Sequence, residues 1–508
     1  MARPSTSYEP RDPGASVLHR IVQDHLETFL AHASQRRDGD GVPAFVERAF
    51  REFLRCGLLA GGFARFHCGA CGLDRLVPFS CKGRALCPSC GGRRMAERAA
   101  HLIDQVMPDV PVRQWVLSLP YRLRYRLAWD HDLCRRVTAV FLRAVFRLLR
   151  DHACAAGLDE PRGGAVAIIQ RFGGALNLNV HIHALVLDGV FARDGAGLIA
   201  FHPARRLTTP DVAEVLAAVE PRIRRRLDGG GLPGGDDGGH AEDCGIDPWA
   251  DEAPALAGLA AASVQGITAL GRRPGTRLRR LGHPREPVET PLGDCHARWK
   301  GWDLHAGLVV AAGQRERLER VCRYALRPPV TPDRLAATAD GQVRLALRHP
   351  WADGTTHVVF DPVEFLGRLA VLVPRPRVNL ILYYGVLGAR ASWRSEVVPR
   401  PASDQDPAAG DPADDDGLAT APDPAQRRVR GQRWADLMRR TFAFDVQSCP
   451  RCGGRLRLIA LIEEAAVISR ILCHLGLPTD LPVARPARAP PLFAVAGDAR
   501  VDLDESAP

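Results

Sequence analysis

The sequence predicts an α+β protein in which helices flank a mostly antiparallel sheet, with a zinc-binding module before it and a small helical unit after it. Segments with strand periodicity and segments with helical periodicity occur in mixed order, as in α+β folds. Two apolar runs at 165–172 and 176–191 are separated by the turn residues Gly173 and Gly174, which predicts a hairpin. Two Cys-x-x-Cys pairs within residues 68–90 predict the zinc-binding module.

Changes in composition divide the 508 residues into eight segments. In chain order they are an N-terminal helical segment (1–60), the zinc-binding module (61–110), the first part of the core (111–226), a disordered acidic insertion (227–257), the second part of the core (258–400), a disordered linker (401–428), a C-terminal unit with a Cys pair (429–478) and a loose tail (479–508). Within them we predict helices at 20–31, 45–58, 133–150 and 314–326, and further strands at 115–119, 308–312, 343–347 and 378–387.

The charge pattern indicates a polyanionic partner. The net charge is +10, although residues 227–253 and 401–425 are rich in Asp and Glu and contain no Lys or Arg. Almost all the positive charge is arginine, because Lys82 and Lys300 are the only lysines. Arginine suits phosphate binding through its planar, two-pronged donor group, although a GC-rich genome would favour the same residue. No apolar run approaches the roughly 18 residues of a membrane span, so we expect a cytoplasmic protein with no membrane partner.

Two histidines at 181 and 183 form the first candidate site. They lie in an apolar, β-branched stretch, and alternate residues of a strand point to the same face, about 7 Å apart. His181 and His183 could therefore bind one divalent ion, or they could simply be two polar residues of a strand. Gln170, at the end of the preceding strand, is a candidate third ligand or a solvent-facing strand residue. Imidazole together with amide oxygen suits Mg²⁺ or Mn²⁺.

Tyr324 is the candidate nucleophile. It lies at the border of the apolar face of the predicted 314–326 helix, so its ring can pack while its hydroxyl reaches outward. Arg320, Arg323 and Arg327 surround it and would attract phosphate. A tyrosine that only anchors the helix to the sheet is the structural alternative.

Tyr121 and Tyr125 are the rival nucleophiles. They are spaced as neighbours on one helical face, with Arg122, Arg124 and Arg126 around them. Because they follow the first core strand and precede the histidines, we interpret them as structural or DNA-stacking residues.

The zinc ligands are predicted from cysteine spacing. Cys68, Cys71, Cys87 and Cys90 form two Cys-x-x-Cys pairs that can surround one structural Zn²⁺. Cys81 could replace one of them, and Cys56 and His67 are weaker substitutes. Nearby basic residues favour DNA contact, namely Arg84, Arg93, Arg94 and Arg98.

A further pair, Cys449 and Cys452, has no matching second pair. Cys473 or His474 would add only a third ligand, which leaves zinc binding by this pair open.

Several motifs together resemble one family. The stretch 171–191, with its Asn-Val-His-Ile-His core, is similar to the histidine motif of the IS91-like transposases, which belong to the HUH class (His, hydrophobic residue, His). Further similar stretches follow the family's order, at 79–90, 318–329, 365–376 and 449–454.

The resemblance implies an HUH-type nuclease core in which His181 and His183 hold a catalytic divalent ion and Tyr324 is the only nucleophile. It implies metal-dependent cleavage and rejoining of single-stranded or hairpin DNA through a 5′-phosphotyrosine, as in rolling-circle transposition. Relatives tend to carry histidine where Tyr384 stands. A plasmid relaxase or replication initiator of the HUH class, and a non-catalytic zinc-dependent DNA-binding protein, are the alternatives. The oligomeric state, a homo-oligomer included, stays open.

Overall fold

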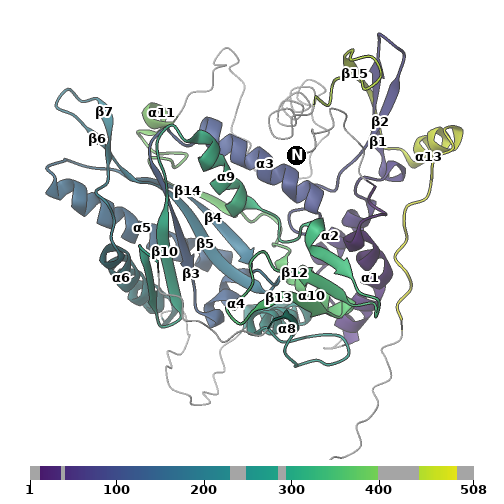
Figure 1. Ribbon diagram of the computed structural model, residues 1–508, viewed down its shortest axis with the longest axis horizontal. Coiled ribbons are helices and arrows are strands. Elements are labelled where there is room, and N and C mark those ends of the chain that lie inside the picture. The colour runs from purple at the N-terminus through teal and green to yellow at the C-terminus, as the bar shows by residue number, and fades with distance from the viewer. Residues whose placement is uncertain (1–11, 36–40, 229–246, 284–292, 399–444, 489–508) are drawn as a thin grey trace, which may run out of the picture.

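A computed structural model describes residues 12–35, 41–228, 247–283, 293–398 and 445–488, and these form the predicted α+β architecture. The main sheet has six strands in the order β14-β4-β5-β3-β10-β9, and every neighbouring pair is antiparallel. Helices flank this sheet, and three smaller sheets surround it (Figure 1). Residues 229–246 of the predicted acidic insertion, the linker at 401–428 and residues 489–508 of the predicted tail lie outside the described residues.

The bounds of the elements are as follows. The strands are β1 (Phe63–Cys68), β2 (Asp74–Pro78), β3 (Val112–Ser118), β4 (Gly164–Phe172), β5 (Leu178–Leu187), β6 (Gly189–Arg193), β7 (Ile199–Pro203), β8 (Arg279–Gly282), β9 (His296–Trp299), β10 (Trp302–Val310), β11 (Leu335–Ala337), β12 (Val343–Ala346), β13 (Thr355–Phe360), β14 (Ile381–Gly385) and β15 (Leu456–Ile462). The helices are α1 (Val17–Gln35), α2 (Ala44–Arg55), η1 (Leu59–Gly61), α3 (Pro88–Gln105), α4 (Tyr121–Trp129), α5 (His131–Ala155), α6 (Thr209–Asp228), α7 (Pro248–Glu252), α8 (Pro254–Gln265), α9 (Arg315–Leu326), η2 (Pro332–Arg334), α10 (Pro362–Leu372), α11 (Arg394–Val397) and α13 (Ala465–His474).

The main sheet separates two hydrophobic cores. Along β5, Ile182, Ala184 and Val186 point into the larger core, which α1, α5, α8 and α10 complete. Leu185 and Leu187 point to the opposite face, where they pack with α3 and α9. Because strand residues alternate, the odd-numbered positions of β5 share the face that α9 covers. The position of β5 in the sheet therefore places both histidines beneath α9.

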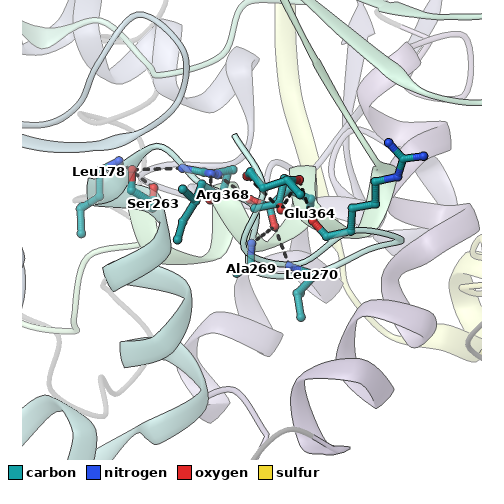
Figure 2. Close-up of polar contacts among 10 residues, drawn as sticks. Leu178, Ser263, Ala269, Leu270, Glu364 and Arg368 are labelled. Carbon is teal, nitrogen blue, oxygen red and sulfur yellow. Dashed lines mark hydrogen bonds and ion pairs between the residues drawn. The ribbon is translucent and has the colours of Figure 1, made fainter. Parts of the chain in front are cut away.

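A buried ion pair fixes the start of β5 to two helices (Figure 2). Arg368 on α10 donates to Glu364 at 2.7 Å, and both side chains are 2% exposed. The other carboxylate oxygen of Glu364 accepts hydrogen bonds from the backbone of Ala269 and Leu270. Arg368 also donates to the carbonyl of Ser263, whose hydroxyl accepts from the Leu178 N–H at the start of β5. Every charge in this network has a partner, so it holds β5 in position, and loss of one partner would cost about 3–5 kcal/mol.

The strand predicted at 176–191 is two strands, β5 and β6. The break falls at Asp188, whose carboxylate forms a largely buried ion pair with Arg113 on β3 at 2.8 Å. The guanidinium donates to both carboxylate oxygens, so the side chain of Asp188 is held at the end of β5. Beyond this point the chain leaves the main sheet and forms the β6–β7 hairpin.

Residues 247–257, predicted as part of the disordered insertion, are instead helical, in α7 and the start of α8. The reason is Trp249, which is 2% exposed and stacks on Tyr125 and Trp129 with ring centroids 4.7 and 5.1 Å apart. One large aromatic residue thus anchors the end of an otherwise acidic segment.

The predicted C-terminal helical unit contains a strand as well as a helix, and it is not separate from the N-terminal part of the chain. Strand β15 pairs antiparallel with β1, which gives a three-stranded sheet in the order β15-β1-β2 beside the main body (Figure 1). Residues 479–488 of the predicted loose tail then contact α1 through a hydrogen bond from Arg485 N to Gln23 O. No helix among the described residues is long and apolar enough to cross a membrane.

Candidate active site and cysteine clusters

The histidine pair lies on β5, a central strand of the main sheet. His181 is opposite Gln170 on β4 and Ser118 on β3. His183 lies two residues further along β5, on the same face of the sheet. Their ring centroids are 4.9 Å apart, and the residues are 9% and 4% exposed. Sheet pairing on both sides of β5 therefore presents two buried imidazoles to one point beneath α9, as the sequence predicts.

Hydrogen bonds at the Nδ1 atoms orient both rings. Nδ1 of His181 lies 2.8 Å from the carbonyl oxygen of Asn179, so it carries the proton and leaves Nε2 as an electron-pair donor. Nδ1 of His183 lies 3.1 Å from Nε2 of the Gln114 side-chain amide, and its own Nε2 is buried with no hydrogen-bond partner among the described residues. Burial lowers the pKa of His181 to about 4 and that of His183 to about 3, where the charges of His181 and Arg327 add to the shift. Both rings are therefore neutral at pH 7, the state a metal ligand requires.

Gln170 completes a set of electron-pair donors on this face. Its amide nitrogen donates to the carbonyl of Ala325 at 3.0 Å, which leaves Oε1 as the unused end of the amide. Within the part of the chain that the structure describes, Oε1 is buried without a hydrogen-bond partner, like Nε2 of His183. An unpaired buried acceptor costs about 1–3 kcal/mol, so two of them on adjacent strands are best explained by a bound group. Two imidazole nitrogens and an amide oxygen fit a divalent cation.

Tyr324 lies directly above the histidines. Its ring meets that of His183 edge to face with centroids 6.1 Å apart, and 49% of the residue is exposed. The Arg327 guanidinium lies 4.1 Å from the ring centroid of Tyr324. Leu318, Cys322 and Ala325 are buried on the other face of α9 and fix the orientation of the helix. The predicted amphipathic geometry is therefore present, with an accessible phenol beside the histidine pair.

The rival tyrosines have other environments. Tyr125 stacks on Trp249, and its hydroxyl donates to Asp247 at 2.8 Å, which is the packing role expected for it. Tyr121 is 52% exposed, and its hydroxyl accepts a hydrogen bond from Arg122. Tyr324 is the tyrosine whose ring contacts the histidine pair within the described parts of the chain.

A basic cavity of about 400 Å³ opens beside Gln170, between α3, the end of α9 and the β4–β14 edge. Its lining includes six arginines and no Asp or Glu: Arg84, Arg94, Arg98, Arg171, Arg327 and Arg394. Apolar residues such as Met95, Phe172 and Leu380 line the rest. The cavity brings together four of the arginines predicted from sequence to contact DNA, Arg84, Arg94, Arg98 and Arg327.

The other three predicted DNA-binding arginines are not part of this cavity. Arg320 is exposed on α9, Arg323 forms an ion pair with Glu319 at 2.6 Å, and Arg93 is half-buried on α3. These three arginines lie on α3 and α9, which also contribute to the cavity, but they do not line it.

The structure corrects the predicted set of zinc ligands. Cys68, Cys71, Cys87 and Cys90 do not meet at one point but are divided between two clusters of four thiols. The first cluster is formed by Cys56, Cys81, Cys87 and Cys90, and the second by Cys68, Cys71, Cys449 and Cys452. The physical reason is the β1–β2 hairpin, because the turn that carries Cys68 and Cys71 lies at its far end from Cys87 and Cys90.

The first cluster joins the end of α2 to the start of α3. Cys56 is the C-cap of α2, and Cys87 is the N-cap of α3. Sulfur–sulfur distances are 3.7 Å between Cys56 and Cys87, 3.6 Å between Cys56 and Cys90, and 3.6 Å between Cys81 and Cys90. Four sulfurs bound tetrahedrally at about 2.3 Å from zinc would lie about 3.8 Å apart, so this cluster has the dimensions of a structural site. Hydrogen bonds from Cys81 and Cys87 lower the pKa of the Cys56 thiol to about 6.

Comparison with known families identifies the chain. Residues 21–119 match the model of a family described as "Transposase zinc-binding domain", which is named for IS91. Residues 164–394 match a second model, described as "Putative transposase". The chain belongs to the IS91-like transposase family. Searches of curated proteins and of solved structures found no match.

The two matched regions of this transposase divide the site between them. The four ligands of the first cluster lie within the zinc-binding match, which supports structural zinc there, and Gln170, His181, His183 and Tyr324 lie within the other match. The second cluster differs, because Cys449 and Cys452 lie outside both matches.

Helix α3 links the first cluster of this transposase to Tyr324. The helix begins at the cluster ligands Cys87 and Cys90 and packs along α9. A Cβ atom at Gly91 would lie 2.8 Å from Pro328 Cβ, so glycine is required where the start of α3 meets the end of α9. Arg315 at the start of α9 donates to the carbonyls of Ile103, Met107 and Pro108 at the other end of α3. The zinc module therefore positions the tyrosine helix at both of its ends.

Sequence reasoning missed Gln114 and ranked Cys56 too low. Gln114 lies on the strand face opposite to that of Trp115 and Leu117, so a polar residue between Val112 and Val116 on that face was the available signal. Cys56 had no local signal, because its partners lie 25 to 34 residues away and no nearby cysteine forms a pair with it.

Proposed function

We propose that this transposase cuts and rejoins single-stranded DNA as a single-tyrosine enzyme of the HUH class, in rolling-circle transposition. The observation that carries the proposal is the contact of the accessible Tyr324 with His183, whose buried Nε2 has no hydrogen-bond partner in the described segments. His181, His183 and Gln170 would hold Mg²⁺ or Mn²⁺, which supplies positive charge to the scissile phosphate.

In the proposed reaction the Tyr324 oxygen attacks the phosphorus of a phosphodiester. The bond between this oxygen and phosphorus forms, and the bond from phosphorus to the 3′ oxygen breaks. The phenol loses its proton, and the departing 3′ oxygen takes one up to become a hydroxyl. The product is a 5′-phosphotyrosine that a 3′-hydroxyl can attack in the reverse sense, so rejoining needs no nucleotide cofactor.

The basic cavity supports single-stranded DNA as the substrate. Arg327 contributes to the cavity and also lies against the Tyr324 ring, so phosphates bound there would lie next to the nucleophile. The apolar part of the lining suits an unstacked base, which is available in a single strand or a hairpin loop and not within a duplex. Such a site favours transposon ends presented unpaired.

An adduct assay tests the proposal. Purified protein would be mixed with end-labelled single-stranded DNA from the transposon terminus and Mg²⁺ or Mn²⁺, and covalent protein–DNA complexes would be counted on denaturing gels. We expect adducts with the wild type, none with Tyr324→Phe and none after chelation of the divalent ion.

Tyr121→Phe and Tyr125→Phe are the matched controls and should form adducts at the wild-type level. Adducts that persist in Tyr324→Phe and vanish in Tyr121→Phe would move the nucleophile to α4. DNA binding without adducts in every protein would instead favour a non-catalytic zinc-dependent DNA-binding protein. Adduct formation followed by strand joining on paired transposon ends would separate a transposase from a plasmid relaxase or replication initiator.

A further inference from the structure

We propose that the second cysteine cluster, formed by Cys68, Cys71, Cys449 and Cys452, binds a structural zinc ion that clasps the C-terminal segment onto the N-terminal zinc-binding module. The four sulfurs lie within 4.8 Å of one another. Two pairs of sulfurs, Cys68 with Cys452 and Cys71 with Cys449, are each 3.6 Å apart, close to the roughly 3.8 Å edge of a zinc tetrathiolate. Each of these pairs joins opposite ends of the chain.

The two halves of the cluster have the same backbone conformation. In the first half the Cys68 N–H donates to the carbonyl of Leu73 and the Gly72 N–H donates to the carbonyl of Cys68, each at 2.9 Å. In the second half the corresponding bonds run from Cys449 N to Gly454 O at 2.7 Å and from Gly453 N to Cys449 O at 2.9 Å.

Glycines at matching positions also show that the two halves of the cluster have the same backbone conformation. Gly72 and Gly453 occupy matching positions with φ values of 71° and 72°, in the left-handed region that favours glycine. The two equivalent turns face each other and bring their four thiols together in a preformed four-thiolate site. Two unrelated surface loops would not produce this arrangement.

The packing around the second cluster is too small to hold the C-terminal segment without such an ion. Among residues 445–488, only Cys449, Leu456, Ile468 and Leu472 are buried hydrophobic residues. They are divided between two small clusters, one around the cysteines and one in which α13 packs on Phe63 and η1. Cores of this size need a metal or a disulfide to be stable, and a bound zinc ion contributes about 10 kcal/mol or more to folding in small domains.

The consequence is that the zinc-binding module of this protein is made from both ends of the chain. Strand β15 completes the β15-β1-β2 sheet only while Cys449 and Cys452 share the ion with Cys68 and Cys71. Residues 479–488 then reach α1, where Arg485 forms an ion pair with Asp24 at 3.0 Å. Zinc at the second cluster thus controls whether the C-terminal segment docks on the N-terminal zinc-binding module or dissociates from it. This inference does not depend on the DNA chemistry proposed above.

Metal content of the full-length chain tests the site. After dialysis against Mg²⁺ buffer, zinc per chain would be measured by elemental mass spectrometry. We expect Cys449→Ser/Cys452→Ser to hold one zinc ion fewer than the wild type. Cys452→His, which keeps a ligand, and Cys473→Ser, which changes an exposed cysteine of α13, should each match the wild type. Equal zinc in the wild type and the double variant, or iron in place of the second zinc, would overturn the proposal.

A cleavable chain tests the clasp itself. A specific protease site inserted at residue 425 would allow the chain to be cut after purification. The C-terminal fragment should stay with the rest in gel filtration for the wild type and Cys473→Ser, and it should separate in Cys449→Ser/Cys452→Ser. Retention of the fragment by the double variant would show that zinc does not hold this segment.

Discussion

The histidine centre and the cysteine clusters are both suited to metal ions, but they are held in different ways. His181, His183 and Gln170 lie on adjacent strands of the main sheet, and their positions follow from sheet register and from the core on either side. The cysteines come from helix ends, hairpin turns and distant parts of the chain, and the four ligands of a cluster do not share one sheet. Removal of a metal should therefore stop the proposed chemistry at the first site, and it should loosen the structure at the others.

The largest effect expected from this comparison is on the histidines. His181→Ala/His183→Ala should lower the rate of adduct formation by about 10³-fold or more, because the phosphate loses its divalent ion. Zinc content and the far-ultraviolet circular dichroism spectrum should match the wild type, since the sheet holds this site. Loss of zinc or of folded structure in the same variant would break the distinction between the two kinds of centre.

Loss of a thiol in the first cysteine cluster should instead affect stability. Cys90→Ser should lower the free energy of unfolding by about 3 kcal/mol or more, because Cys90 belongs to the large core as well as to the cluster. Cys449→Ser should lower the stability of the main transition much less, because the second cluster packs only with a few residues. Denaturant melts that give equal losses for the two variants would contradict the separation of the clusters.

The buried histidines also predict a pH dependence. Their pKa values, about 4 and about 3 in the folded protein, lie below the unfolded value of 6.5, so protonation favours the unfolded chain below pH 6.5. The stability contribution is complete above pH 6.5 and is lost as the pH falls toward 4. Between pH 7.5 and 5.5, in Mg²⁺-free buffer, each histidine should cost about 1.4 kcal/mol. We expect His181→Ala/His183→Ala to show a shallower loss in denaturant melts at the same two pH values, and an equal slope would refute this assignment.

The smallest expected effect concerns Gln114, which contacts His183 and does not belong to the proposed ligand set. For His183 Nε2 to bind a metal, Nδ1 must carry the proton. The Gln114 amide, whose Nε2 lies 3.1 Å from Nδ1, must then turn over to present its oxygen. Gln114→Leu should weaken activation by Mn²⁺ by about 10–100-fold, with the maximal cleavage rate largely recovered at high Mn²⁺. Gln114→Glu, which also accepts from Nδ1, should restore the Mn²⁺ dependence. A loss that saturating Mn²⁺ does not recover would point to a structural role.

The sequence by itself determined the features that depend on local spacing. The alternation along 179–189 was enough to predict a strand with two histidines on one face, and the pattern around Tyr324 predicted its helix and its border position. The α+β class and the presence of a cysteine-based zinc module also followed from local patterns, because periodicity and ligand spacing are properties of neighbouring residues.

Only the tertiary structure decided which distant groups meet. Cys87-Pro-Ser-Cys90-Gly-Gly and Cys449-Pro-Arg-Cys452-Gly-Gly have nearly the same sequence, yet the first begins α3 and the second is a turn before β15. The sequence could not show that Cys449 belongs with Cys71, which is 378 residues away, or that Gln114 faces His183. Such contacts depend on strand order and on how hairpins and helices pack, and these are settled by burial of the whole chain rather than by the spacing of any one motif.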